Sequence, residues 1–254
     1  MKNANSFDKI ATSYYNSVPD IPQKYINLLT RTFAVRKEDN VLDLGCGAGD
    51  LTLELAKKSS HMTGIDSSKT MIKMAQEKDK DKKVNWIHSS VEDFDFGKEK
   101  YNLVFTYEAF HLFHHREELI RRVSDSLKRD GFLAIGWAMY AFDYPLKSTI
   151  EEVFAHYGRP WDDWGAWTCP DFSKLVKESN VGLSDVHTKK IVVKAQTSTD
   201  KIIDYFFSVS KTASLTDNEK KNIFKDLKER IERIYPTGES IGYNEHSIAY
   251  CMKI

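Results

Sequence analysis

VLDLGCGAGD, residues 41–50, begins as a short apolar strand and ends in glycines at positions 45, 47 and 49. A helical pattern opens directly after it. A buried strand that runs into closely spaced glycines and then a helix is how α/β domains build a floor for a nucleotide-like ligand. The stretch therefore predicts a ligand site at this first strand-to-helix turn, although a tight turn without a ligand is an alternative.

Around this stretch, short apolar runs alternate with amphipathic helices. The predicted strands are Val41–Leu44, His61–Ile65, Val84–His88, Tyr101–Thr106 and Phe132–Trp137, and the helices lie near 50–58, 68–78 and 116–128. This alternation predicts a parallel sheet with helices on both faces. Beyond residue 140 we expect helical pieces at 149–156 and 172–178, strands at 186–194 and 248–252, and helices ending near 207 and 235.

Composition narrows the class of protein. The 254 residues are 41% hydrophobic and 29% charged, with 37 basic and 37 acidic side chains. A protein that binds a nucleic-acid backbone usually has a basic excess, so we expect no nucleic-acid partner. The three cysteines are far apart, which indicates neither a disulfide framework nor a metal site. The absence of a long apolar run predicts a cytoplasmic protein without a membrane partner. The mixed-sign run 78–83 is expected to be a solvated loop.

Asp66 ends the second predicted strand, about 20 residues after the glycines, where dinucleotide sites place an acid on the ribose hydroxyls. Helix capping is the alternative role, but Ser67 and Ser68 are already available for it. The spacing of the glycines differs from the G-x-G-x-x-G fingerprint, which speaks against a nicotinamide cofactor. Ser89–Asp93, after the third strand, are expected to line the same crevice.

These motifs together resemble the class I S-adenosylmethionine-dependent methyltransferases of the small-molecule branch, and relatives of the trans-aconitate methyltransferase kind in particular. The matching segments, in family order, are VLDLGCGAGD, GIDSSKTMIKMA, SSVEDFDF, YNLVFTYEAFHLF and LKRDGFLAIGW. FDKIATSYY near the N-terminus resembles the segment that closes over the cofactor. The resemblance implies an α/β fold: a doubly wound, Rossmann-like sheet of seven strands, mostly parallel with an antiparallel last strand, plus a helical substrate cap.

The resemblance also implies four segments. They are an N-terminal helical lid (1–36), a cofactor-binding α/β core (37–140), a substrate-cap insertion (141–182), and C-terminal strands and helices that complete the sheet (183–254). The insertion carries Trp161, Trp164 and Trp167 together with Tyr140, Tyr144 and Tyr157. Such rings suit a flat, apolar or cationic acceptor, although they can equally serve only to attach an irregular segment to the sheet.

The cofactor implied by the resemblance is S-adenosylmethionine, with S-adenosylhomocysteine as product and no metal. Its implied contacts are Tyr14, Asp43, Gly45, Gly47, Gly49, Asp66, Ser67, Met71, Ser90, Val91, Glu92 and Thr106. Met71 reads equally well as helix core. Many relatives have aspartate where Ser90 stands, so a charged contact to the adenine amine is replaced here by a weaker one.

Methyl transfer from a sulfonium requires alignment of nucleophile, methyl and sulfur, and a base only when the acceptor must lose a proton. His111 is the best candidate base, with Glu108 and His114 behind it, and a structural role for His111 stays open. The family often has tryptophan where Leu112 stands. Because of this difference, a substrate role of that position in the family is not carried over to Leu112.

The predicted activity is transfer of a methyl group from S-adenosylmethionine to a small-molecule acceptor at oxygen, nitrogen or carboxylate. A non-catalytic S-adenosylmethionine-binding protein is the first alternative, and a nicotinamide-dependent oxidoreductase is a weaker one. The sequence leaves the acceptor and the oligomeric state open.

Overall fold

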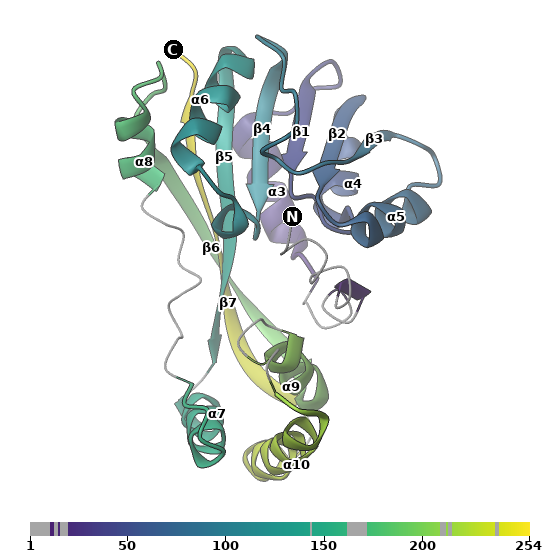
Figure 1. The fold of residues 1–254 in the computed structure, drawn as a ribbon, viewed down its shortest axis with the longest axis vertical. Helices are drawn as coiled ribbons and strands as arrows, with labels where there is room; N and C mark the ends of the chain where they lie inside the picture. Colours follow the sequence, from purple (N-terminus) through teal and green to yellow (C-terminus); the bar gives the residue numbers. More distant parts are fainter. Residues whose placement is uncertain are drawn as a thin grey trace.

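The computed structural model describes residues 11–12, 15, 20–142, 144–161, 172–208, 212, 215–236 and 239–254. One sheet runs through these residues, with strand order β3-β2-β1-β4-β5-β7-β6 (Figure 1). The strands are β1 (Asn40–Leu44), β2 (His61–Asp66), β3 (Val84–His88), β4 (Tyr101–Tyr107), β5 (Leu127–Phe142), β6 (His187–Ser198) and β7 (Glu239–Met252). β1 to β5 pair in parallel, whereas β7 runs antiparallel to both β5 and β6. The prediction of a seven-stranded, mostly parallel sheet with an antiparallel last strand is confirmed.

Helices cover both faces of the parallel part of the sheet, because its strands are apolar on both sides. On one face, α3 (Gln23–Phe33) and α4 (Asp50–Ala56) bury Leu29, Phe33, Leu51 and Leu55 against the strands. On the other face, α6 (Arg116–Ser126) and α8 (Phe172–Ser179) bury their apolar residues. α5 (Lys69–Lys78) packs beside β2 and β3. None of the helices in the described ranges is both long and apolar enough to cross a membrane.

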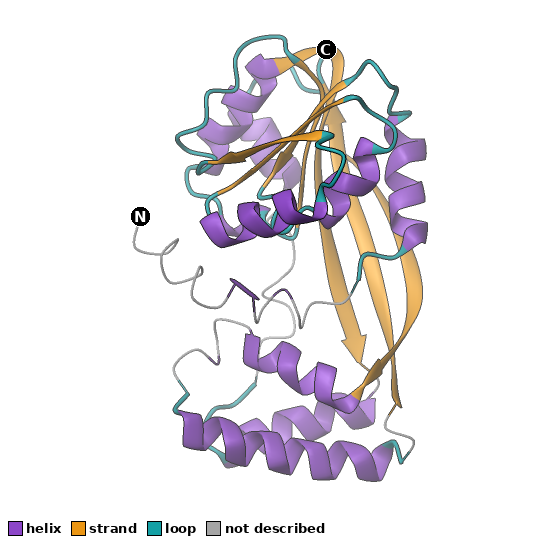
Figure 2. Ribbon diagram, turned by 90° about the vertical axis from the view of Figure 1, so that its right-hand side faces the viewer, coloured by secondary structure: helices purple, strands orange, loops and turns teal. Residues whose placement is uncertain are grey.

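Three further helices form a separate cluster at the far end of the longest strands (Figures 1 and 2). They are α7 (Tyr144–His156), α9 (Thr199–Ser208) and α10 (Asp217–Ile234), and their shared core includes Phe154, Phe206 and Leu227. The cluster thus combines one helix from the predicted insertion 141–182 with two from the segment 183–254, while α8 packs on α6 instead.

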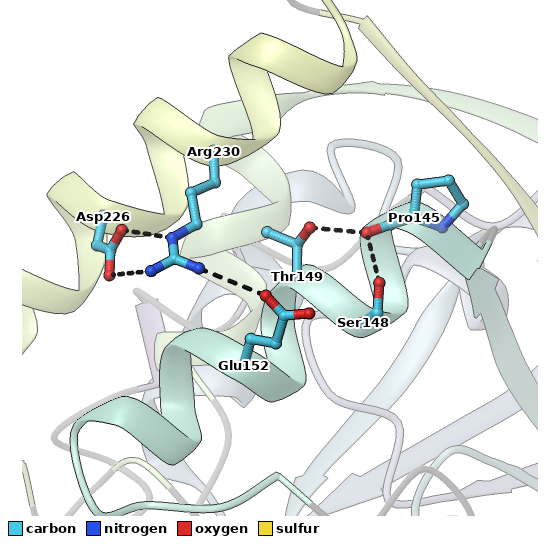
Figure 3. Close-up of polar contacts among 6 residues, drawn as sticks. All are labelled: Pro145, Ser148, Thr149, Glu152, Asp226 and Arg230. Carbon is cyan, nitrogen blue, oxygen red and sulfur yellow. Dashed lines mark hydrogen bonds and ion pairs between the residues drawn. The ribbon is translucent and has the colours of Figure 1, made fainter.

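The helical cluster also carries an exposed polar contact between α7 and α10 (Figure 3). The Arg230 Nε donates to Asp226 Oδ1 at 2.7 Å within α10, and its NH1 nitrogen lies 3.5 Å from Glu152 Oε2 on α7. Exposed ion pairs of this kind contribute about 0–1 kcal/mol. The buried apolar residues, rather than these charges, therefore hold the cluster together.

Strands β5 and β7 are longer than their apolar patterns predict. Their pairing continues from Phe132↔Met252 to Phe142↔Gly242, well past the residues that the core helices cover. The β7 residues 239–247, ESIGYNEHS, are rich in Gly, Asn, Ser and Glu, which have low strand propensity. Pairing on both sides of β7 overrides this preference.

The expectation of a solvated loop at 78–83 is wrong for its first two residues. Lys78 is the last residue of α5, and its ammonium group donates to the carbonyl of Ala48 at 3.0 Å. Asp79 is buried and accepts hydrogen bonds from the backbone of Lys83 and Val84 and from the indole of Trp86. These hydrogen bonds hold the pKa of the Asp79 carboxyl below its usual value.

Replacing Asp79 by alanine is expected to lower the free energy of unfolding by about 1–3 kcal/mol, because the buried Val84 N–H loses its partner. Urea unfolding followed by circular dichroism measures the change. Asp81→Ala is the matched control, since Asp81 is exposed and paired only with Lys83, so it should change stability by less than about 0.5 kcal/mol. Equal effects of the two variants would show that the Asp79 hydrogen bonds do not stabilise the turn.

Candidate functional site

The predicted site residues gather at the carboxyl ends of the parallel strands, on the side of the sheet that faces the helical cluster (Figure 1). β1 has β2 on one side and β4 on the other. The chain first adds β2 and β3 on one side of β1 and later adds β4 on the other side, so the strand order reverses at β1. Ligands of open α/β sheets bind at such a switch point, outside the carboxyl ends of the strands.

The three glycines after β1 differ in what surrounds them. All have positive φ, at 71° for Gly45, 53° for Gly47 and 82° for Gly49. A Cβ on Gly45 would lie 2.6 Å from the Cβ of Ala109, and one on Gly49 would lie 2.5 Å from the ring of Trp86. A Cβ on Gly47 would meet no atom of the described residues within 4 Å. Packing within the protein therefore requires glycine at positions 45 and 49. At position 47, glycine instead lets a ligand at the switch point come close to the protein backbone.

Asp66, the last residue of β2, ties the glycine loop to the start of α5. One carboxylate oxygen accepts from the Gly47 N–H at 2.9 Å, and the other accepts from the Ser68 N–H at 2.8 Å. Ser68 is the N-cap of α5 and accepts from the Met71 N–H, while Ser67 is exposed. A carboxylate at the end of the second strand is the group that accepts ribose hydroxyls in dinucleotide sites, and Asp66 is partly exposed at this position.

Asp43 lies beneath the loop rather than at its surface. It is only 3% exposed and accepts a hydrogen bond of 2.6 Å from the hydroxyl of Thr52 on α4. Burial, with a smaller contribution from the charge of Asp66, raises the pKa of Asp43 to about 7. In this arrangement Asp43 joins β1 to α4 and supports the loop from below.

The edge after β3 is held in place by a residue that the sequence reading missed. Arg122, on α6, donates to the backbone carbonyls of Glu92 at 2.8 Å and Phe94 at 2.6 Å. Glu92 in turn accepts from the backbone N–H of His114 at 3.0 Å, which joins the loops after β3 and β4. An arginine on an amphipathic helix reads as a surface charge, so no sequence signal indicated this role.

The other residues of the loop after β3, which was predicted to border the adenine, contact the protein itself. The Ser90 hydroxyl donates to the Asp93 carboxylate at 2.8 Å, and Val91 is buried. Ser90 therefore stabilises its own turn in the structure. Its hydroxyl oxygen retains acceptor capacity for a ligand amine.

Two described residues of the N-terminal segment, Ala11 and Tyr15, lie beside the glycine loop. Ala11 is fully buried in a cluster with Ala48 and Met71, and Tyr15 packs beside them. Lys78 reaches this segment from α5, with its ammonium 2.7 Å from the Tyr15 hydroxyl and 4.0 Å from the centre of the Tyr15 ring. Met71 thus forms part of the core under the N-terminal segment.

Some predicted aromatic contacts lie outside the described residues: Tyr14, Trp164 and Trp167, and the side chains of Tyr140 and Tyr144. Trp161 is described and is buried against Phe154 and Phe206, at ring-centroid distances of 5.0 and 4.8 Å. It belongs to the core of the helical cluster and does not attach the segment to the sheet.

The end of β4 brings three predicted residues together. The Thr106 hydroxyl is buried and has no hydrogen-bond partner among the residues that the structure describes. Glu108 has a positive φ of 57°, and its carboxylate accepts from the N–H of Ala138 on β5. Burial raises the pKa of Glu108 to about 7, with the Ala138 hydrogen bond opposing the shift.

His111 lies three residues further on, in the short 3₁₀ helix Phe110–Leu112. Burial and the charge of Arg116 lower the pKa of its half-buried ring, so the imidazole is neutral at physiological pH and able to accept a proton. Arg116 also donates to the backbone carbonyl of His111 at 2.6 Å. Leu112 is 60% exposed and turns away from the core.

Sequence reasoning missed three further polar residues at this edge, namely Tyr25 of α3, Tyr107 of β4 and His246 of β7. The Tyr107 hydroxyl is 2.8 Å from Nδ1 of His246, and the ring of Tyr25 packs against both of these rings. A Cβ on Gly136 would lie 2.2 Å from the Tyr25 hydroxyl, so glycine is required there. Because His246 stands in the polar run 239–247, no strand pattern placed it beside β5.

Comparison with known proteins agrees with this geometry. Residues 41–131 match the family described as a methyltransferase domain. A carboxy-S-adenosyl-L-methionine synthase of Nautilia profundicola is 31% identical over 124 residues, which are 47% of this chain and 53% of that protein. A malonyl-[acyl-carrier protein] O-methyltransferase of Bacillus cereus is 22% identical over 259 residues, covering 96% of this chain and 91% of the relative. The chain spans between 53% and 62% of the length of the first three relatives.

Solved structures show the same fold. The YcgJ protein of Bacillus subtilis has a TM-score of 0.55 at 19% identity, covering 91% of this chain and 99% of that one. The phosphoethanolamine N-methyltransferase 2 of Haemonchus contortus, solved with S-adenosyl-L-methionine, has a TM-score of 0.57 at 17% identity, covering 97% of this chain and 57% of that one.

Proposed function

Because residues 41–131 are a methyltransferase domain of the S-adenosylmethionine-dependent class I kind, we propose that this chain moves a methyl group from S-adenosylmethionine to a small-molecule acceptor. The cytoplasmic location and the lack of a nucleic-acid partner remain predictions from composition.

The observation that carries the proposal is the pairing of Gly47 with Asp66. Among the described residues, no side chain covers the backbone of Gly47 at the switch point, and the partly exposed carboxylate of Asp66 lies directly beside it. The carboxylate at the end of β2 suits the ribose of a nucleoside, and the uncovered backbone of Gly47 suits an amino-acid chain attached to that nucleoside. The short glycine spacing favours S-adenosylmethionine over the dinucleotide of an oxidoreductase.

Bound S-adenosylmethionine supplies a methyl group on a cationic sulfur, already activated for in-line displacement. The work left to the protein is to align the acceptor with that methyl group and to exclude water. Asp66 and Gly47 hold the nucleoside, the edge fixed by Arg122 borders the adenine, and Lys78 holds Tyr15 beside the glycine loop. Thr106, Glu108 and His111, at the end of β4, border the acceptor.

The test is formation of S-adenosylhomocysteine when the full chain is incubated with methyl-labelled S-adenosylmethionine and a broad panel of metabolites. Transfer of label to at least one small molecule is the expected result. Binding of S-adenosylhomocysteine without transfer to any acceptor would favour a non-catalytic binding protein. Binding of NAD in its place would favour an oxidoreductase.

Replacing His111 by alanine is expected to lower turnover by roughly ten- to a hundredfold, because the neutral ring beside the methyl position helps to align the acceptor. The affinity for S-adenosylhomocysteine should change far less. His61→Ala is the control, since His61 is exposed at the opposite end of β2. If the variant instead loses cofactor affinity and keeps turnover, His111 has a structural role.

A further inference from the structure

Four side chains from three distant parts of the sequence meet at the carboxyl edge of the sheet, and we call them the edge cluster: Tyr25, Tyr107, Glu108 and His246. The ring centroids of Tyr25 and Tyr107 are 5.1 Å apart, and those of Tyr25 and His246 are 5.3 Å apart. Tyr25 and His246 are buried, whereas Tyr107 and Glu108 are partly exposed. A molecule that arrives at this edge therefore meets Tyr107 and Glu108 first.

The two buried members hold Tyr107 in place. The Tyr25 hydroxyl donates to the backbone carbonyl of Ser247 at 3.1 Å, which fixes α3 against β7. His246 lies opposite Ala138 on β5 and hydrogen-bonds to Tyr107 through Nδ1 at 2.8 Å. Its Nε2 atom is buried and has no partner within the described ranges. Burial lowers the pKa of His246 to about 4, so this ring carries no charge at physiological pH.

Glu108 continues the ladder of hydrogen bonds at the point where β4 ends. The pairing of β4 with β5 ends at Tyr107↔Gly136. The N–H of Ala138 lies beyond this point and donates to the Glu108 carboxylate. The amide oxygen of a glutamine would satisfy this N–H equally well and without a charge. Burying a carboxylate instead is costly when no cation accompanies it. The choice of an acid here is therefore not explained by the fold alone.

Among the described residues, no basic side chain forms an ion pair with Glu108. Glu108 instead acts on Tyr25, whose pKa is raised by burial and by the charge of Glu108. Strand β6 lies beyond β7 in the sheet, and two of its lysines bond elsewhere: Lys189 to Thr32, and Lys190 to Glu245. An acidic acceptor would face an uncompensated carboxylate, whereas a cationic acceptor would supply the missing partner.

We propose that the edge cluster is the acceptor subsite and that the acceptor is a small molecule with a basic amine, which Tyr107 and Glu108 bind through the ring and the carboxylate. An ammonium group is attracted both to a carboxylate and to the face of a tyrosine ring. This inference rests on the proposed methyl transfer and assigns its substrate class.

The same arrangement gives Glu108 a chemical role. An ammonium nitrogen has no lone pair, so it must lose a proton before it attacks. Glu108 accepts that proton, the freed nitrogen pair forms the new bond to carbon, and the sulfur–methyl bond breaks with its electron pair remaining on sulfur. The products are a methylated ammonium, neutral S-adenosylhomocysteine and protonated Glu108, which returns its proton to water.

The test compares the full-length wild-type chain with Glu108→Gln, which keeps an acceptor for the Ala138 N–H, and with Glu77→Gln as control. Glu77 is exposed on α5 and forms only an i,i+4 pair with Lys73. The acceptor panel contains primary and secondary amines, carboxylic acids and alcohols of similar size. The readouts are methyl transfer, calorimetric binding of S-adenosylhomocysteine, and the shift in unfolding temperature that each acceptor gives to the S-adenosylhomocysteine complex.

We expect methyl transfer to amines and an amine-dependent rise in unfolding temperature in the wild type. In Glu108→Gln, transfer should fall by roughly 10²- to 10⁴-fold, while S-adenosylhomocysteine still binds and the rise given by amines is lost. Transfer to acids or alcohols alone, full transfer to amines by Glu108→Gln, or no response to any amine by a chain that binds S-adenosylhomocysteine would overturn the proposal. Failure to bind S-adenosylhomocysteine at all would instead reject the methyl-transfer function itself, and with it this inference.

A pH series on the same two proteins gives a readout that does not depend on activity. Burial raises the pKa of Glu108 in the folded chain to about 7 from its ordinary value of 4.5, so the folded state retains this proton to higher pH. The wild type should therefore lose stability relative to Glu108→Gln as pH rises between about 4.5 and 7. A difference in unfolding temperature that does not change with pH would show that Glu108 is not in the buried environment that the proposal requires.

Discussion

Asp66→Ala should weaken the binding of S-adenosylhomocysteine by about 1.5–3 kcal/mol, the range for hydrogen bonds to a charged group. This corresponds to a loss of affinity of roughly ten- to 150-fold. The carboxylate loses its proposed contacts to the ribose hydroxyls, and the Gly47 N–H loses the bond of 2.9 Å that orients the loop. Isothermal titration calorimetry measures the affinity directly.

Two further measurements separate the ligand contact from damage to the fold. Circular dichroism melting of Asp66→Ala reports the cost of leaving the N–H groups of Gly47 and Ser68 without their acceptor. Asp81→Ala, at an exposed position outside the site, should bind S-adenosylhomocysteine as the wild type does. Unchanged affinity in Asp66→Ala would remove Asp66 from the site.

Gly47→Ala and Gly49→Ala should fail in different ways. At Gly47 the new methyl group meets no atom of the described residues within 4 Å, so the positive φ is what destabilises the fold, by about 1–2 kcal/mol. That methyl group would occupy the space that we assign to the cofactor, and binding of S-adenosylhomocysteine should be lost. At Gly49 the methyl group would lie 2.5 Å from the ring of Trp86 and 3.0 Å from Ala75, so this variant should be the less stable.

The pair therefore distinguishes a ligand floor from a tight turn. Melting temperatures rank the stability of the two variants, and calorimetry on the folded Gly47→Ala protein reports its affinity. A Gly47→Ala chain that binds S-adenosylhomocysteine as tightly as the wild type would mean that the open space at Gly47 is not part of the cofactor site. A Gly49→Ala chain as stable as Gly47→Ala would contradict the packing argument.

The parallel core could be predicted because its strands are buried on both faces and read as continuous apolar runs, as in Val41–Leu44 and Tyr101–Thr106. The parts of β5 and β7 that extend toward the helical cluster could not be predicted in this way. Residues 239–247 adopt strand geometry because they have a partner on each side, and local propensity contains no information about those partners.

The site shows the same division. Gly47 and Asp66 follow strands that the sequence marks clearly, so their meeting could be expected. Arg122 and Lys78 act through backbone carbonyls that are distant in sequence, and side chains of this kind read as solvated charges. His246 joins Tyr107 across 139 residues, a contact that depends on the full sheet topology.

Calorimetric titration of the full wild-type chain with S-adenosylhomocysteine, with NAD titrated in parallel, tests the central claim most directly. We predict saturable one-to-one binding of S-adenosylhomocysteine and no binding of NAD. Binding of NAD without binding of S-adenosylhomocysteine would contradict the assignment of the Gly47–Asp66 edge to S-adenosylmethionine.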